Sequence, residues 1–561
     1  MTRNILQSSL KNVGFSIIFQ IACRFVTFGI NAFIVRRVGS DILGLMNVRL
    51  LLLESTLLFI SREAIMRASL SATSQQKNKS SWTQVINLIW LSVPICILCI
   101  PVCLYIWFHV WSPVEPRLVS QYTFACYSVA LSCVIELAAE APVFVAQVFC
   151  FVKFKIFMNT LYIFLRSVVF IWIVLSNDKI AITAFGIAQI SSAVTIILGN
   201  YTFFHWYTKK LQEERKKESK EKETSELFQK MDDFPFSSIK EMLPKGIGRI
   251  QNLNKDDLDE VFNMELLILT WSFFKQGFFK YLLTEGEKIL MSLSSVFSFS
   301  EQGIYDVVNN LGSLAARFIF RPVEDNAYFY FTQTISRDVP LAEQKRDKIM
   351  EAGKVLKYLC ATVSTIGLIA LTFGQSYSET VLFLYGGEKL VQGAILLKWH
   401  SVAICLMAVN GVTEGYMFAT NTSQGIDNYK YFMLFFSVMF LLLSFILTYF
   451  MGPVGFILAN CINMICRIFY SLRFIKDQYK TIGIKPLIGI VPGKLFVIVL
   501  AVLGVLCKIS ENFFNECIPC HLVVGGISGL LCIAAWCLEN RELLSLFLES
   551  KFGSKLKMKT K

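Results

Sequence analysis

Long apolar segments recur along nearly the whole 561-residue chain, and they limit what it can fold into. A helix needs about twenty mainly apolar residues to cross a bilayer. Only 17% of the residues are charged, against about 25% in soluble domains. The sequence therefore predicts an all-α polytopic membrane protein with about fourteen transmembrane helices. We place them near residues 13–35, 43–63, 84–108, 121–148, 156–176, 181–205, 264–294, 302–332, 354–376, 392–419, 430–450, 452–475, 486–507 and 520–538.

The predicted helices fall into two groups on either side of a charged segment. Residues 1–205 and 263–480 hold six helices each, and we expect two pseudo-symmetric lobes around a central cavity. Residues 206–262 between them are dense in mixed charge and poor in apolar residues, which predicts a flexible or surface-helical linker in the cytosol. Residues 481–540 predict two additional transmembrane helices, and 541–561 form a basic cytosolic tail.

Lysine and arginine residues gather in alternate loops, and this bias orients the chain. Such residues are enriched on the cytosolic side of membrane proteins. The pattern predicts that both termini lie in the cytosol. Because the basic residues lie between apolar runs, the net charge of +13 is a topology signal and does not indicate nucleic-acid binding.

Matching positions in the two halves indicate an internal repeat. Gly44 and Gly303 each follow a short polar turn and open a helix, and Arg62 and Arg321 end those helices. Both pairs are 259 residues apart (303 − 44 and 321 − 62). Transporters are often built from two such halves, with the substrate bound at their interface near the middle of the membrane.

Charged and polar residues interrupt four of the predicted helices, near 13–35, 43–63, 264–294 and 302–332. A charge at the bilayer centre costs at least ~2.5–3.5 kcal/mol, so these helices should face protein or a water-filled cavity. Arginine suits a pyrophosphate, because its planar guanidinium donates two parallel hydrogen bonds and stays charged. The candidate substrate-binding residues are Arg24, Arg36, Arg62, Arg317, Arg321, Asn309 and Asn310, with Glu54, Glu63, Glu285, Glu287 and Glu324 as pairing partners for the arginines.

Arginines at helix ends have a second interpretation. Arg36, Arg62 and Arg321 lie there, and such side chains also extend to lipid headgroups. Arg24 and Arg317 sit deeper, which favours a place in the cavity.

Polar residues away from the helix ends also have two interpretations. Asn309 and Asn310 fit a sugar or a bond to a neighbouring helix. Glu140 and Glu414 lie deep in their helices, where a carboxylate serves structural hydrogen bonding or coupling and gating. The sequence holds no Walker loop, no spaced metal ligands and no nucleophile–base pair, so we expect no enzyme, no cofactor and no metal.

Several long blocks of the sequence are distinctive, and they include NAFIVRR, NVRLLLLESTLLFISREA, ELAAEAPVFVAQ, LTWSFFKQGFFKYLLTEGEK, GIYDVVNNLGSLAARFIF and NGVTEGYMFA. These blocks resemble the Rft family of endoplasmic-reticulum proteins. The resemblance implies the fold of the multidrug and lipid-linked precursor exporters, with two six-helix lobes. It further implies a substrate-binding role for Arg36, Arg62, Glu287 and Arg317.

The resemblance also implies a function in protein N-glycosylation. The chain would move a mannose and N-acetylglucosamine dolichyl-pyrophosphate intermediate from the cytosolic to the luminal leaflet of the endoplasmic reticulum. One alternative is an accessory factor that binds this lipid, or other enzymes of the pathway, without transporting it. Another is an ion-coupled exporter of small molecules, which the many arginines disfavour.

Two features near the C-terminus concern location and redox state. Lys557 and Lys559 have the spacing of a dilysine signal for retrieval to the endoplasmic reticulum. Cys517 and Cys520 stand in a predicted loop, and the sequence favours two unrelated cysteines over a disulfide or a metal half-site.

Overall fold

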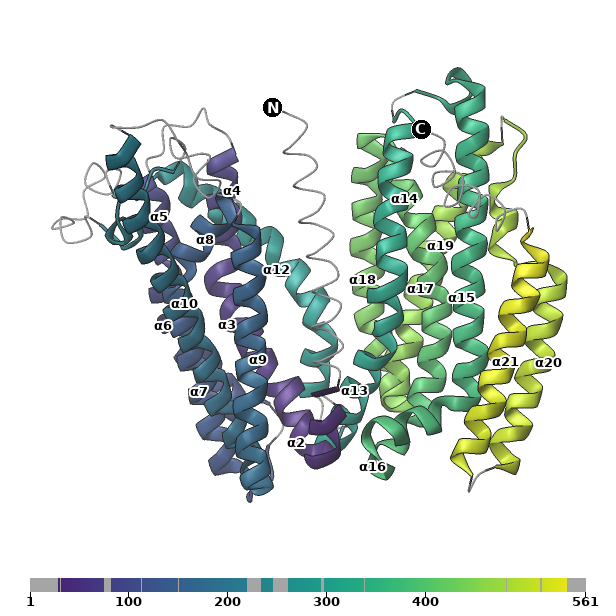
Figure 1. Ribbon diagram of the computed structural model, residues 1–561, viewed down its shortest axis with the longest axis horizontal. Coiled ribbons are helices and arrows are strands. Elements are labelled where there is room, and N and C mark those ends of the chain that lie inside the picture. The colour runs from purple at the N-terminus through teal and green to yellow at the C-terminus, as the bar shows by residue number, and fades with distance from the viewer. Residues whose placement is uncertain are drawn as a thin grey trace. The chain divides into compact units, whose positions relative to one another are not determined.

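The computed structural model describes residues 29–30, 32–74, 82–111, 113–149, 151–218, 234–245, 261–293, 297–337, 339–480, 482–514 and 517–541. Every regular element in these residues is a helix, which confirms the predicted all-α class. The chain divides into two compact units, Met1–Gly303 and Ile304–Lys561. Within each unit the long helices run side by side (Figure 1).

The first unit contains fifteen complete elements within the described residues. They are α2 (Ser40–Gly44), η1 (Leu45–Leu50), α3 (Leu51–Leu58), η2 (Phe59–Glu63), α4 (Ala64–Ser74), α5 (Trp82–Trp90), α6 (Ser92–Tyr105), η3 (Ile106–Val110), α7 (Val119–Ala138), α8 (Glu140–Val148), α9 (Val152–Ser176), η4 (Asp178–Ile180), α10 (Ala181–Glu218), η7 (Ile239–Met242) and α12 (Met264–Leu293). The helix α13 (Phe299–Ala315) begins in this unit and ends in the next.

The second unit continues from α13. Its elements are η9 (Ala316–Phe320), α14 (Arg321–Thr334), η10 (Leu341–Glu343), α15 (Arg346–Gly386), α16 (Glu388–Val391), α17 (Ala394–Thr420), α18 (Ser423–Met451), α19 (Val454–Tyr479), η11 (Pro486–Ile490), α20 (Lys494–Phe513) and α21 (Ile518–Glu539).

Eleven helices in the described residues are long and apolar enough to cross a membrane. Each coincides with one of the predicted spans. The spans predicted at 264–294 and 302–332 are helical too, as α12 and as α13 to α14, but they are not among the eleven. The span predicted at 13–35 lies mostly outside the described residues. The number of crossings, fourteen, therefore stays a prediction.

The helix predicted over 121–148 is wrong in one respect, since it is broken at Ala139 into α7 and α8. Proline has no N–H, so Pro142 cannot donate to the carbonyl of Ala138 four residues earlier. The hydroxyl of Tyr201 donates to that carbonyl instead, at 2.9 Å. The break puts Glu140 in the first turn of α8, where the helix starts again.

Part of the predicted linker is packed into the first unit, which corrects the expectation of a flexible or surface segment. The side chains of Phe234, Phe236 and Met242 are buried in a core cluster with residues of α5, α8 and α10. Asn87 is 1% exposed. Its amide nitrogen donates to the carbonyl oxygens of Lys245 at 2.9 Å and Val261 at 3.1 Å. Ile239 also packs against this cluster, whereas Leu243 is exposed.

The repeat-related glycines pack against each other's helices reciprocally. A Cβ on Gly44 would lie 2.0 Å from the carbonyl oxygen of Phe299, and a Cβ on Gly303 would lie 2.1 Å from that of Ser40. Phe299 and Ser40 are themselves 259 residues apart. Only glycine allows the two backbones to approach this closely. The reciprocal contact of Gly44 and Gly303 supports the internal repeat, because equivalent positions of the two halves meet in the structure.

Candidate functional site

A charged cavity lies inside the first unit, in two adjoining parts of about 510 and 440 Å³. Arg62, Glu63 and Arg67 line both parts. The first part is completed by α3, α9 and α12, and the second by α7, α8, α9 and α10. Five basic and five acidic side chains line the two parts. They are Arg62, Arg67, Lys155, Arg166 and Lys288, and Glu54, Glu63, Glu136, Glu140 and Glu285.

Arg62 lies where the two parts meet. It belongs to the π-helical turn η2. Its Nη1 donates to Oε1 of Glu136 at 2.8 Å and lies 3.6 Å from Oε2 of Glu140. The side chain of Glu140 is 6% exposed and that of Arg62 is 32% exposed. Both carboxylates therefore lie beside the same nitrogen of a guanidinium that an incoming ligand can still reach.

The other cations of the cavity also stand beside acceptors. Arg67 pairs with Glu63 at 2.7 Å and Lys288 with Glu285 at 3.1 Å. Nη1 of Arg166 lies 4.0 Å from Oε2 of Glu54. Paired charge lowers the cost of burial, and the pairs can exchange for ligand contacts when an anion enters.

Arg62 and Glu140 were candidates from the sequence, and Glu54 and Glu63 were expected partners for the arginines. Both of these carboxylates do stand beside arginines, but the arginines are Arg166 and Arg67 instead of Arg62. Glu136 was missed, although its position four residues before Glu140 was a usable signal. Arg166 was missed as well, and its isolation within an apolar run was the clue.

The remaining candidates are scattered. Arg24 lies outside the described residues, as does the side chain of Arg317. Arg36 and Arg321 are exposed, and Asn309 is half-buried. Asn310 donates to Asp306 at 3.0 Å. Among the side chains that the structure describes, Arg36, Arg321, Asn309, Asn310 and Glu287 line neither part of the cavity.

Glu414 lies in a separate network in the second unit. Arg467 donates to both of its carboxylate oxygens, from Nε at 3.2 Å and from Nη2. The hydroxyl of Tyr429 donates at 2.6 Å and the amide of Asn410 at 3.1 Å. The carboxylate therefore has the structural hydrogen bonds that were one of its two expected roles. A coupling role stays a prediction.

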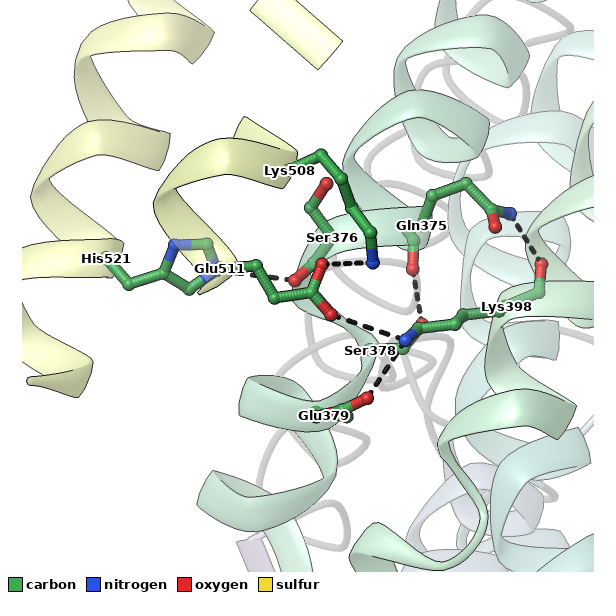
Figure 2. Close-up of polar contacts among 9 residues, drawn as sticks. Gln375, Ser376, Ser378, Glu379, Lys398, Lys508, Glu511 and His521 are labelled. Atoms are coloured by element: carbon green, nitrogen blue, oxygen red, sulfur yellow. Dashed lines mark hydrogen bonds and ion pairs between the residues drawn. The ribbon is translucent and has the colours of Figure 1, made fainter. Parts of the chain in front are cut away.

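A second polar network joins α20 and α21 to α15 and α17 within the second unit (Figure 2). Nζ of Lys398 on α17 lies 2.9 Å from Glu379 and 3.3 Å from Glu511. The ring of His521 stacks on Tyr377 at 4.0 Å, and its Nδ1 lies 2.9 Å from Oγ of Ser510. These contacts hold the pair of helices against α15, so their role is structural.

The two loop cysteines are bonded to each other. A disulfide joins Cys517 and Cys520 just where α21 begins, which overturns the favoured interpretation of two unrelated cysteines. The backbone brings their Cα atoms to 5.4 Å, within the range that a disulfide requires.

The fold and the charged cavity define an all-α polytopic membrane protein. The structure of a lipid II flippase MurJ, in an inward closed conformation, matches with a TM-score of 0.56 and 12% identity. The match covers 94% of this chain and 100% of that one.

The chain belongs to the Rft protein family, whose family model matches residues 8–550. The Man(5)GlcNAc(2)-PP-dolichol translocation protein RFT1 of Drosophila melanogaster is 55% identical over 100% of both chains. The protein of the same name from Xenopus tropicalis is 36% identical, over 97% of this chain and 96% of its own.

Proposed function

We propose that this protein moves a dolichyl-pyrophosphate-linked oligosaccharide of mannose and N-acetylglucosamine from the cytosolic to the luminal leaflet of the endoplasmic reticulum. The observation that carries the proposal is the open, charged cavity of the first unit, in a chain whose relatives are named for this translocation. It is a transporter and not an enzyme.

The glycan needs such a cavity to cross. Each polar group that enters hydrocarbon without a hydrogen-bond partner costs several kcal/mol, so a heptasaccharide cannot pass through lipid unaided. A cavity lined by carboxylates, guanidinium groups and amides replaces those bonds. The apolar dolichyl chain has no such need and stays in the lipid.

The pyrophosphate binds at the cations of the cavity. Arg62 turns from Glu136 and Glu140 to the phosphate oxygens, with Arg166 and Lys288 beside it. The exchange of one anionic partner for another keeps the guanidinium paired throughout. From the sequence we further propose Arg24, Arg36, Arg317, Arg321, Glu287, Asn309 and Asn310 as substrate contacts outside this cavity, and a coupling or gating role for Glu140 and Glu414.

The wider organisation is proposed from the sequence. Residues 1–205 and 263–480 form the two lobes, both termini lie in the cytosol, and other enzymes of the N-glycosylation pathway are partners. Alternation of the two lobes would carry the substrate between leaflets.

Reconstituted vesicles test the proposal. Purified protein is placed in vesicles that carry the labelled dolichyl-pyrophosphate heptasaccharide, and transfer between leaflets is followed. We expect transfer by the wild type and by Arg117→Gln, a control at an exposed side chain outside the cavity. Arg62→Gln should transfer at least tenfold more slowly. A folded wild type that binds the lipid without moving it would refute transport and favour the accessory factor.

A further inference from the structure

One face of α12 carries a stripe of side chains that are aromatic at one end and charged at the other. Trp271, Phe274, Phe278 and Tyr281 are followed on the same stripe by the ion pair of Glu285 and Lys288. The spacing is 3, 4, 3, 4 and 3 residues, and side chains at such spacing lie on one side of a helix. The stripe is therefore aromatic over its first eleven residues and charged at its end.

The charged end shows which way the stripe faces. Glu285, Lys288 and Tyr281 line the first part of the cavity. An ion pair is costly in contact with hydrocarbon, so the face that carries it lies toward the cavity. The aromatic residues on that same face continue away from the cavity along the helix axis, for about 15 Å at ~1.5 Å per residue.

Three rings of the stripe and the ring of Phe59, from η2, stack one after another. Phe59 stacks on Tyr281 with centroids 4.4 Å apart and on Phe274 at 6.1 Å, and Phe274 stacks on Trp271 at 5.4 Å. The planes of these pairs differ by 13°, 27° and 12°. A Cβ on Gly277 would lie 3.3 Å from the ring of Phe59, so glycine leaves that ring room to lie flat on α12.

Two aromatic side chains of the stripe are exposed. The side chain of Trp271 is 60% exposed and that of Phe278 is 46% exposed. Nearer the cavity, the hydroxyl of Tyr281 hydrogen-bonds with Oγ1 of Thr56 at 2.7 Å. Flat apolar rings beside hydroxyl groups suit a ligand that has both apolar faces and polar edges.

We propose that the aromatic part of this stripe, together with Phe59, is the binding site for the sugar rings of the lipid-linked oligosaccharide; its residues are Trp271, Phe274, Phe278 and Tyr281. A pyranose has an apolar face of C–H groups that packs on an aromatic ring and hydroxyl groups that reach polar neighbours. The inference rests on the proposed function, which places the pyrophosphate at the charged end of the stripe. The sugars then extend from the pyrophosphate over Tyr281 and toward Trp271.

Two lipid probes separate sugar binding from pyrophosphate binding. Equilibrium binding to the purified full chain is measured with the dolichyl-pyrophosphate heptasaccharide and with dolichyl pyrophosphate without sugar. Trp271→Ala should weaken binding of the first about tenfold, the loss expected for one good ring contact, and change the second less than twofold. Trp271→Phe should keep most of the affinity because it keeps a ring. Trp172→Ala, at a 71% exposed position on α9, is the matched control.

The outcomes distinguish this site from the proposed function. Equal weakening of both probes by Trp271→Ala would assign the stripe to the lipid or to folding, and no weakening of either would place it against the bilayer. Both results overturn the sugar site while the transport proposal stands. If the wild type binds neither probe, the pyrophosphate site fails and the sugar site fails with it.

Discussion

Removing the charge of Arg62 should damage stability and transport for different reasons, and a second substitution should separate them. In Arg62→Gln the carboxylates of Glu136 and Glu140 lose the guanidinium that lies 2.8 and 3.6 Å away. Removing one partner of a fully buried ion pair costs about 3–5 kcal/mol. Because the side chain of Arg62 is 32% exposed, we expect a smaller loss of about 2–3 kcal/mol in the free energy of unfolding.

The double variant Arg62→Gln with Glu140→Gln removes one of the two carboxylates as well. Glu140 is the more deeply buried of them, with 6% of its side chain exposed against 22% for Glu136. The double variant should therefore recover most of the lost stability, since water reaches the carboxylate that remains. It should not recover transport, because a charged hydrogen bond to the pyrophosphate, worth about 1.5–3 kcal/mol, is still missing.

Thermal unfolding in detergent and leaflet transfer in vesicles are measured on the same preparations. We expect the apparent melting temperature to fall in the single variant and to return in the double variant, while transfer stays at least tenfold below wild type in both. Recovery of transfer together with stability would refute the reasoning, since Arg62 would then be needed only to hold the fold.

Two further predictions concern packing in the first unit. Gly303→Ala places a methyl group 2.1 Å from the backbone of Ser40, which should cost about 1–3 kcal/mol of stability by overpacking; an unchanged melting temperature would show that the close contact is absent in the membrane. Asn87→Leu removes the amide that binds Lys245 and Val261, at about 1–3 kcal/mol for the lost and unsatisfied bonds. Limited proteolysis should then cut residues 234–245 faster than in the wild type, and equal rates would contradict the packing of this segment.

Much of the fold could be predicted from the sequence because membrane spans are local features. A helix that crosses lipid satisfies all of its backbone hydrogen bonds within one segment, so the apolar run alone locates it. The repeat was readable for a similar reason, since glycine and arginine recur at a constant offset of 259 residues. The eleven-residue aromatic stripe of α12 is likewise visible in its spacing.

Only the tertiary structure decided which charges meet. Arg62 pairs with carboxylates 74 and 78 residues away (136 − 62 and 140 − 62) instead of with its sequence neighbour Glu63. That choice depends on how α7 and α8 are broken at Ala139 and how they pack against η2, and periodicity carries no information on either. The packing of residues 234–245 was hidden for the same reason, because three buried side chains outweigh the charge around them once a partner surface exists. Local composition specifies where a helix lies, whereas ion pairs and docked segments depend on contacts between distant parts of the chain.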